Sequence, residues 1–233
     1  MILGDPHGNI KALKQCFERA NFDYEKDRLI VLGDVCDGFP YVSEVIDEFL
    51  KVKNIVLILG NHDAWALEWY CREDPYHDTE PQKYWVEQGG YATMKSYYNK
   101  AMPKAHIEFL QSNYPYFVDE KNNVYVHGGI DPNCKMENQR LDILTWDRDL
   151  IRVARMKHNQ RKDYKYGGFN NIFVGHTTTQ CYGDTKPLHY CNVWDLDTGA
   201  GWSGKLTIMD RDTEEYWQSD RANELYEDRS MRY

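Results

Sequence analysis

Four of the five glycine-containing polar motifs in this chain come directly after an apolar run. The motifs occupy residues 4–8, 33–38, 60–63, 126–129 and 175–177, and each places Asp, Asn or His beside glycine. Glycine allows the backbone to bend sharply and to approach other groups closely. Because ligands of open α/β sheets bind beyond the carboxyl ends of the strands, we expect an α/β protein with one shared site there.

The first third of the chain predicts the order β-α-β-α-β. Residues 28–32 and 54–59 are continuous apolar runs, which are typical of strands buried on both faces. Residues 9–20 and 41–53 carry apolar side chains at helical spacing, and Asn9 is a candidate cap for the first helix. Residues 1–3 read as the end of a strand, so either the first strand is short or the true start lies upstream.

The remainder is expected to complete a single domain spanning residues 1–233. We interpret residues 64–115 as a mostly helical insert beside the site, whose many Trp and Tyr side chains we expect mainly in the core. Residues 116–126 and 171–174 predict strands, with some helix around 148–157. Residues 193–197 and 205–209 predict a hairpin pair that closes a second sheet.

Composition excludes several classes of function. The formal charge of -9 argues against duplex nucleic acid as the main partner. The chain shows no apolar run of membrane-spanning length and no secretory signal, so we expect no membrane contact. Six scattered cysteines without a C-x-x-C pair indicate reduced thiols and a cytoplasmic location.

The motifs supply carboxylate, imidazole and amide groups, a ligand set for hard and borderline divalent cations. Asp34 is the best candidate to bridge two cations, because its strand is expected between those of two other motifs. Asp5 and His7 lie one residue apart and can turn toward one cation. The second cation is expected to be completed by Asn61, His127 and His176. Because no thiolate takes part, manganese is expected, with iron and zinc as alternatives.

His62 follows a predicted ligand but is poorly placed for the same cation, so it is free to act as an acid. Asp37 is positioned to orient its imidazole. Cys36 lies inside a motif, yet the chemistry does not need it, and we expect it to pack in the core. Four further histidines lack such settings and are expected to be surface or ordinary polar residues, namely His77, His106, His158 and His189.

This motif set resembles the calcineurin-like metallophosphoesterases, and more narrowly the serine/threonine protein phosphatases of phage and bacterial type. The resemblance covers nearly the whole chain. Residues 85–90 match the W-x-x-x-G-G segment of that branch, residues 146–148 match its W-x-R element, and residues 197–206 match its D-T-G-A…G-x-L ending.

The resemblance implies a four-layer fold in which two packed mixed β-sheets are flanked by helices. It implies two divalent metal ions that share Asp34, and His62 with Asp37 as the acid pair. It further implies that Arg148 contacts phosphate, and we expect Asn61 to face the substrate as well. The implied ligands are Asp5, His7 and Asp34 for one metal, and Asp34, Asn61, His127 and His176 for the other.

Two positions depart from the family pattern. Gly38 stands where the family usually has an arginine, so one phosphate-binding guanidinium is missing. Arg72 and Arg152 are candidates to replace it. Asp63 stands where Glu is common, which we treat as a minor change.

The predicted function is hydrolysis of phosphomonoesters by a two-metal phosphatase that acts on a phosphoprotein or a related phosphoester. A symmetrical dinucleoside polyphosphate hydrolase is an alternative, although that relative typically lacks the equivalent of Asp37. A phosphatase or phosphodiesterase for nucleic-acid ends or cyclic phosphates stays open because of Gly38. A degenerate scaffold would be marked by lost metal ligands, and none is lost.

Overall fold

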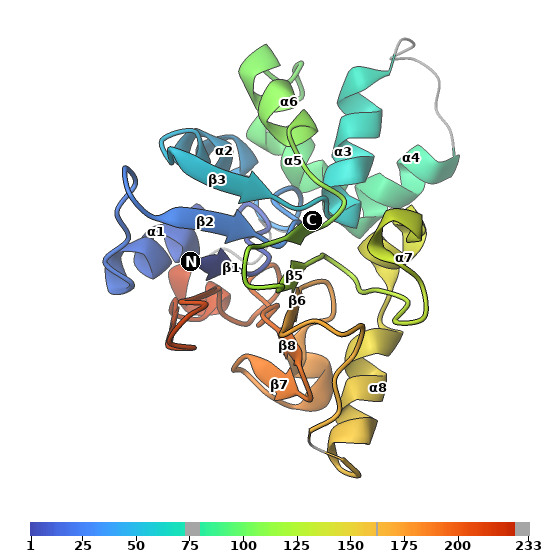
Figure 1. Cartoon of the computed structure of the whole chain (residues 1–233). Helices are drawn as coiled ribbons and strands as arrows, with labels where there is room; N and C mark the ends of the chain where they lie inside the picture. Colours follow the sequence, from blue (N-terminus) through green and yellow to red (C-terminus); the bar gives the residue numbers. More distant parts are fainter. Residues whose placement is uncertain (73–79, 162, 227–233) are drawn as a thin grey trace.

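The computed structural model describes residues 1–72, 80–161 and 163–226, so His77 lies outside the described residues. In the described part, two five-stranded sheets pack together, with helices on their outer sides (Figure 1). One sheet has the order β10-β9-β1-β2-β3 and the other β4-β5-β6-β8-β7. Both sheets are mixed, which confirms the two-sheet architecture expected from the sequence.

The described strands are short. In the first sheet they are β1 (Ile2–Leu3), β2 (Arg28–Val31), β3 (Asn54–Leu57), β9 (Thr207–Met209) and β10 (Tyr216–Gln218). In the second sheet they are β4 (Phe117–Val118), β5 (Val124–Tyr125), β6 (Ile172–Val174), β7 (Leu188–Tyr190) and β8 (Val193–Asp195).

The described helices are α1 (Ile10–Arg19), α2 (Val42–Phe49), α3 (Asn61–Cys71), α4 (Glu80–Trp85), α5 (Tyr91–Ser96), α6 (Lys104–Gln111), α7 (Leu141–Trp146), α8 (Asp149–His158) and α9 (Ala222–Leu225). Residues Val86–Gly90 form a π-turn, and Met136–Asn138 and Thr179–Tyr182 are short 3₁₀ turns. Among the described helices, none is long and apolar enough to cross a bilayer.

The predicted β-α-β-α-β order of the first third is confirmed. Strands β1, β2 and β3 pair in parallel, with Ile30 opposite both Ile2 and Val56. The Asn9 side chain accepts a hydrogen bond from the amide of Ala12, so it caps α1 as predicted.

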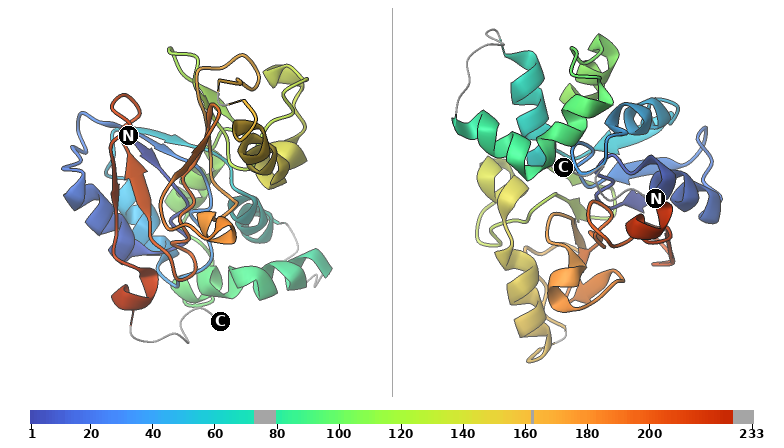
Figure 2. Two further views of the ribbon diagram at one scale, coloured as in Figure 1. Left: turned by 90° about the horizontal axis from the view of Figure 1, so that it is seen from below. Right: turned by 180° about the vertical axis from the view of Figure 1, so that it is seen from behind.

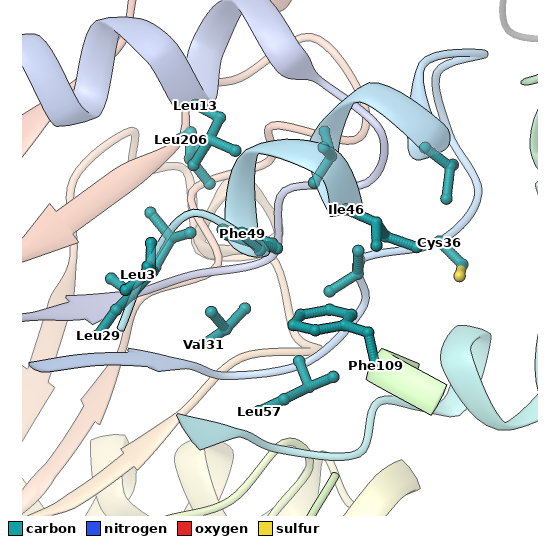
Figure 3. Packing of buried hydrophobic residues seen from close by; sticks show 14 of the residues in the cluster. Leu3, Leu13, Leu29, Val31, Cys36, Ile46, Phe49, Leu57, Phe109 and Leu206 are labelled. Atoms are coloured by element: carbon teal, nitrogen blue, oxygen red, sulfur yellow. The ribbon is translucent and has the colours of Figure 1, made fainter. Parts of the chain in front are cut away.

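Alternation along the central strands distributes side chains between two apolar layers. Ile2 and Ile30 face the space between the sheets, whereas Leu3 and Val31 face α1 and α2. Figure 3 shows the second layer, in which Leu3, Val31 and Phe49 lie close together. In Figure 2, α1 lies on one outer side of the sheets and α7 and α8 lie on the opposite side. These layers fix the strand ends that carry the polar motifs.

The segment predicted as a helical insert contains α4, α5 and α6, and α3 begins just before it, at Asn61. Its aromatic residues divide into two sets. Trp85 and Tyr97 are buried in the core, as expected, but Trp65 and Tyr84 line an open cleft. That the segment is an insert within a single domain stays a prediction.

The predicted hairpin pair near the C-terminus is wrong. Strand β8 pairs with β6 and β7 in the second sheet, whereas β9 pairs with β1 and β10 in the first. The intervening chain therefore crosses between the sheets. The actual hairpin partners, β7 and β10, each lie a few residues from the strand that they join, and each is only three residues long.

Candidate metal centre

The polar motifs lie at the carboxyl ends of parallel strands in both sheets. Asp5, Asp34 and Asn61 follow β1, β2 and β3, and His127 and His176 follow β5 and β6. Since parallel strands end at the same edge of a sheet, side chains distant in sequence meet there. The packing of the two sheets then brings both edges together (Figure 1).

Two groups of candidate ligand atoms share one carboxylate. In one group the ligand atoms of Asp5, His7 and Asp34 all lie within 4.8 Å of one another. In the other group the same holds for Asp34, His127 and His176. Asn61 Oδ1 lies 3.0 Å from His127 Nε2. All six side chains predicted as ligands thus lie together, and Asp34 occupies the shared position.

Backbone carbonyls orient two of the imidazoles. His127 Nδ1 lies 2.7 Å from the carbonyl oxygen of Leu32, and His7 Nδ1 lies 2.9 Å from that of Cys36. A carbonyl only accepts hydrogen bonds, so each Nδ1 carries a proton, and Nε2 is the ring nitrogen that faces Asp34. This is how proteins commonly fix histidines that ligate metals.

Four residues of the site have a left-handed backbone conformation. The φ angles are 44° at His7, 50° at Asp34, 69° at Asp37 and 64° at His176. Such conformations are uncommon outside glycine and cost about 1–3 kcal/mol each where sparsely populated. The surrounding structure holds them, and strain of this kind concentrates at functional sites.

Glycines provide the close approach between motifs. A Cβ at Gly60 would lie 2.2 Å from Asp34 Oδ1, and a Cβ at Gly175 would lie 2.1 Å from Asp5 Oδ1. Any larger residue at either position would displace a candidate ligand. The glycine beside each polar residue is therefore part of the site.

Buried polar atoms test whether cations fit here. Among the described residues, Asp5 Oδ1 and His176 Nε2 are buried and have no hydrogen-bond partner. Buried polar groups are nearly always paired, so these two orphaned atoms in a carboxylate and imidazole cluster fit metal coordination. Burial, together with the charges of Asp197 and Asp34, raises the pKa of Asp5 well above its usual value, a cost that divalent cations would offset.

The predicted acid pair is in contact. His62 Nδ1 lies 2.6 Å from Oδ2 of Asp37, which is fully buried. Burial lowers the pKa of His62, but the charge of Asp34 and the hydrogen bond to Asp37 outweigh it and raise the pKa to about 9. His62 lines the same cleft as Asp34 and Asn61. The protein groups alone therefore favour a protonated imidazole that faces the cleft.

Two further residues hold Asp37, and this role of theirs was not predicted from the sequence. Trp85 Nε1 donates to Asp37 Oδ2 at 2.9 Å, and Thr93 Oγ1 donates to Oδ1 at 2.6 Å. The amide of Asp37 donates to Thr93 Oγ1 at 2.8 Å. The W-x-x-x-G-G segment was a signal for Trp85, because a Cβ at Gly90 would strike its ring at 2.4 Å. Thr93 had no sequence signal.

A cleft of about 950 Å³ opens over the candidate ligands. Arg148 lines it and donates from Nη1 to the carbonyl oxygen of His176 at 2.8 Å, so its guanidinium is tied to a predicted ligand segment. Arg152 lines the same cleft. Arg72 instead lies over the ring of Trp69 and lines a different pocket, so it is not placed to replace the missing family arginine.

A recess of about 170 Å³ lies beside Gly38, the residue that stands where the resemblance implies an arginine. Among the described residues that line it, none is Lys or Arg, and Glu87 is acidic. Gly38 has a φ of 74°, and a Cβ there would lie 2.9 Å from both Cβ and the carbonyl oxygen of His7. An arginine at this position would therefore be strained in this chain.

The other three histidines that the structure describes lie outside the cleft. His106 is buried between Tyr97 and Asp47, His158 accepts a hydrogen bond from the amide of Cys191, and His189 stacks on Trp194. Cys36 is fully buried within the core cluster of Figure 3, the packing role expected for it.

Known proteins share this sequence pattern and fold. The family model described as calcineurin-like phosphoesterase matches residues 1–198. A serine/threonine-protein phosphatase 1 of Salmonella typhimurium is 22% identical over 89% of both chains. A symmetrical bis(5'-nucleosyl)-tetraphosphatase of Pseudomonas fluorescens is 24% identical over 91% of both chains. The crystal structure of a putative diadenosine tetraphosphatase superposes with a TM-score of 0.69 at 16% identity, covering 93% of this chain and 90% of that one, which shows the shared fold.

Proposed function

This chain belongs to the calcineurin-like phosphoesterases, and from that premise we propose that it is a phosphatase that uses two divalent metal ions to hydrolyse phosphomonoesters of the phosphoserine and phosphothreonine type. The observation that carries the proposal is the pair of ligand groups sharing Asp34, with the hydrogen-bonded His62 and Asp37 beside them.

Asp5, His7 and Asp34 would hold one cation, and Asp34, Asn61, His127 and His176 would hold the other. When bound, the cations would lower the pKa of water to provide a nucleophile and would neutralise charge on the phosphoryl oxygens. The proposed identity is manganese, because the ligand set contains oxygen and nitrogen but no thiolate. A cytoplasmic location is also proposed, and it rests on six free cysteines.

His62 is proposed as the general acid. Its protonated imidazole would give a proton to the ester oxygen as the bond to phosphorus breaks. Asp37 would keep the ring oriented and favour its charged form, since the carboxylate is itself fixed by Trp85 and Thr93. This pair favours a substrate with a poor leaving group, such as a serine alkoxide, which needs protonation most.

Arg148 is proposed to bind the substrate phosphate together with Asn61. Both line the cleft beside Asp34, and the tie from Arg148 to the His176 carbonyl limits where the guanidinium can move. A preorganised guanidinium loses less entropy on binding and can contact phosphate bidentately.

Hydrolysis of dinucleoside polyphosphates is a second candidate. The cleft continues past the candidate ligands to Arg152, so more than one phosphate could be contacted. Because the chain has Asp37, hydrolysis of dinucleoside polyphosphates ranks below hydrolysis of phosphomonoesters.

A substrate panel tests the proposal. The protein, purified with Mn²⁺, would be offered a phosphoserine peptide, nitrophenyl phosphate, bis-nitrophenyl phosphate and diadenosine tetraphosphate, each with and without chelator. We expect the monoesters to be turned over fastest and the chelator to abolish activity. Full activity after metal removal, or turnover of the tetraphosphate alone, would overturn the proposal.

A further inference from the structure

We infer that Trp65, Tyr84 and Trp146 form an aromatic platform that binds a planar aromatic leaving group beside the scissile phosphate. The inference rests on the proposed two-metal site and goes beyond the proposed phosphoserine and phosphothreonine substrates, because it adds monoesters whose leaving group carries a ring. Its basis is the position, exposure and mutual geometry of the three rings.

The platform is continuous with the predicted catalytic groups. Trp65 lies one turn after His62 on α3, with ring centroids 5.2 Å apart. The ring of Trp146 lies 4.9 Å from that of Trp65 and 5.6 Å from that of His176. Tyr84 lies 5.5 Å from Trp65. The rings therefore run from the proposed acid to a candidate metal ligand, along the junction of α3, α4 and α7 (Figure 1).

The rings are open to the cleft. Tyr84 is 51% exposed and Trp146 is 42% exposed, and all three platform residues line the cleft. Their mutual contacts are edge-on or tilted, with interplanar angles of 80° between Trp65 and Tyr84 and 66° between Trp65 and Trp146. Clustered aromatic rings that remain open beside a polar site are typical of binding surfaces.

The place of the platform identifies which part of the substrate it meets. His62 would protonate the leaving oxygen, so the group carried by that oxygen lies on the His62 side of the phosphate. Trp65, whose ring meets that of His62 edge-on, is the adjacent surface. Three residues that follow His176 in the chain, Thr177, Thr178 and Gln180, also line the cleft and offer hydroxyl and amide groups. Aromatic faces and hydroxyl and amide groups in one cleft suit a planar ring that carries polar substituents.

Stacking of a planar group on an aromatic side chain contributes appreciably to binding, and loss of one such partner commonly lowers affinity by about tenfold or more. A tyrosyl phenol and a nucleobase both offer such a ring. The shared chemistry is therefore a planar π system, and the test distinguishes these two sources.

The central measurement compares two monoesters with similar leaving-group acidity, phenyl phosphate and hexafluoroisopropyl phosphate. Matching the acidity removes the difference in intrinsic reactivity, so the ratio of their kcat/KM values reports recognition of the ring. We expect Trp65→Leu and Trp146→Leu each to lower the aromatic-to-alkyl ratio about tenfold. Trp65→Phe keeps an aromatic face, so it should retain most of the wild-type aromatic-to-alkyl ratio. Tyr91→Leu is a matched control, because Tyr91 is 43% exposed but does not line the cleft.

Binding of products provides a readout that needs no turnover. N-acetyltyrosinamide and adenosine would be titrated into the metal-loaded protein and followed by side-chain NMR shifts of the Trp indole groups. Binding that perturbs Trp65 and Trp146 and weakens in the Leu variants supports the inference, and whichever compound binds identifies the source. Equal losses on both esters, or unchanged ratios in both Leu variants together with no product binding, overturn it. Failure to hydrolyse any monoester would instead refute the proposed function. In that case product binding would still show whether the aromatic platform binds a planar ring.

Discussion

At His62 the imidazole is bound to a fully buried carboxylate on one side and open to the cleft on the other. If it is the general acid, His62→Asn should lower kcat by about 10²–10⁴-fold on a phosphoserine peptide. The loss should be smaller on nitrophenyl phosphate, since nitrophenolate leaves without protonation. Steady-state kinetics on both substrates, with metal content measured in parallel, provides the test. Equal losses on both substrates, or loss of metal, would instead indicate a structural or ligand role.

Gly38 and Glu87 together predict a second effect at the scale of single residues. The recess beside Gly38 has the acidic Glu87 and, among its described lining residues, no Lys or Arg, so we expect the dianionic monoester to lose more stabilisation than a monoanionic diester. Because Gly38 itself cannot carry a side chain without strain, the charge is better restored from Glu87. Glu87→Arg should raise the monoester-to-diester ratio of kcat/KM about tenfold, as expected for a charge-assisted contact.

Glu87→Gln is the matched control for that experiment. It removes the negative charge without adding a positive one, so it should raise the same ratio by less than Glu87→Arg does. An unchanged ratio in a folded, metal-loaded Glu87→Arg protein would mean that monoester selectivity does not arise in this recess.

The positions of the candidate ligands were predictable because each motif combines a glycine with a polar residue at a strand end. Close approach leaves a visible mark in the sequence, as at Gly60 and Gly175. Thr93 leaves no such mark. It reaches Asp37 only through packing of α5 against α2 and the π-turn, and a lone threonine in a helix has no local pattern that predicts such a contact.

At the scale of elements, α4 and α5 hold the proposed acid pair. Trp85 and Thr93 supply the donors that satisfy Asp37, and both belong to the predicted insert. Thr93→Val keeps the shape but removes the hydroxyl, which leaves a buried carboxylate oxygen without its partner. We expect a loss of about 1–3 kcal/mol in the free energy of unfolding, together with a lower kcat.

Thr93→Ser keeps the hydroxyl and should restore most of both quantities. Denaturant unfolding and kinetics on the same preparations provide the comparison. If Thr93→Val and Thr93→Ser behave alike, the methyl group rather than the hydrogen bond is what matters at this position.

Strand identity was more predictable than strand partnership. Residues 193–197 and 205–209 were correctly expected to contain strands, yet β8 and β9 belong to different sheets. A hairpin inference relies on short separation along the chain, whereas the crossover here is decided by which sheet offers an edge to pair with. Gly199 and Lys205 do form an isolated bridge, so the two segments diverge only beyond it.

At the scale of the whole molecule, the sheets are joined at both ends. The candidate ligands come from both sheets at the carboxyl ends of the parallel strands. At the opposite end, Arg211 from the β9–β10 turn pairs with Asp119, which follows β4, at 2.8 Å. Asp119 also accepts hydrogen bonds from Asn123 and from the hydroxyl of Tyr125 on β5. The network therefore connects one sheet with the other through one buried carboxylate.

This carboxylate predicts how stability depends on pH. Burial opposes ionisation of Asp119, but the hydrogen bonds from Asn123, Tyr125 and Arg211 outweigh it and hold its pKa below the usual value. A pKa that is lower in the folded state stabilises the fold above the unfolded value of about 3.9, and the contribution is lost as pH falls through the folded pKa. Asp119→Asn should therefore cost about 1.5–3 kcal/mol near neutral pH, the range for hydrogen bonds to a charged group. The difference between wild type and variant should shrink below a pH of about 4.

Urea unfolding of both proteins across this pH range, with chelator present throughout, isolates the network from any metal contribution. Glu120→Gln is the control, because Glu120 pairs with the same Arg211 but is exposed, so solvent screens the pair and little change is expected. A difference between wild type and Asp119→Asn that stays constant well below pH 4, or grows there, would show that ionisation of Asp119 does not stabilise the folded state. If the difference in unfolding free energy between wild type and Asp119→Asn disappears below pH 4, protonation of Asp119 is what weakens the contact between the sheets opposite the metal centre.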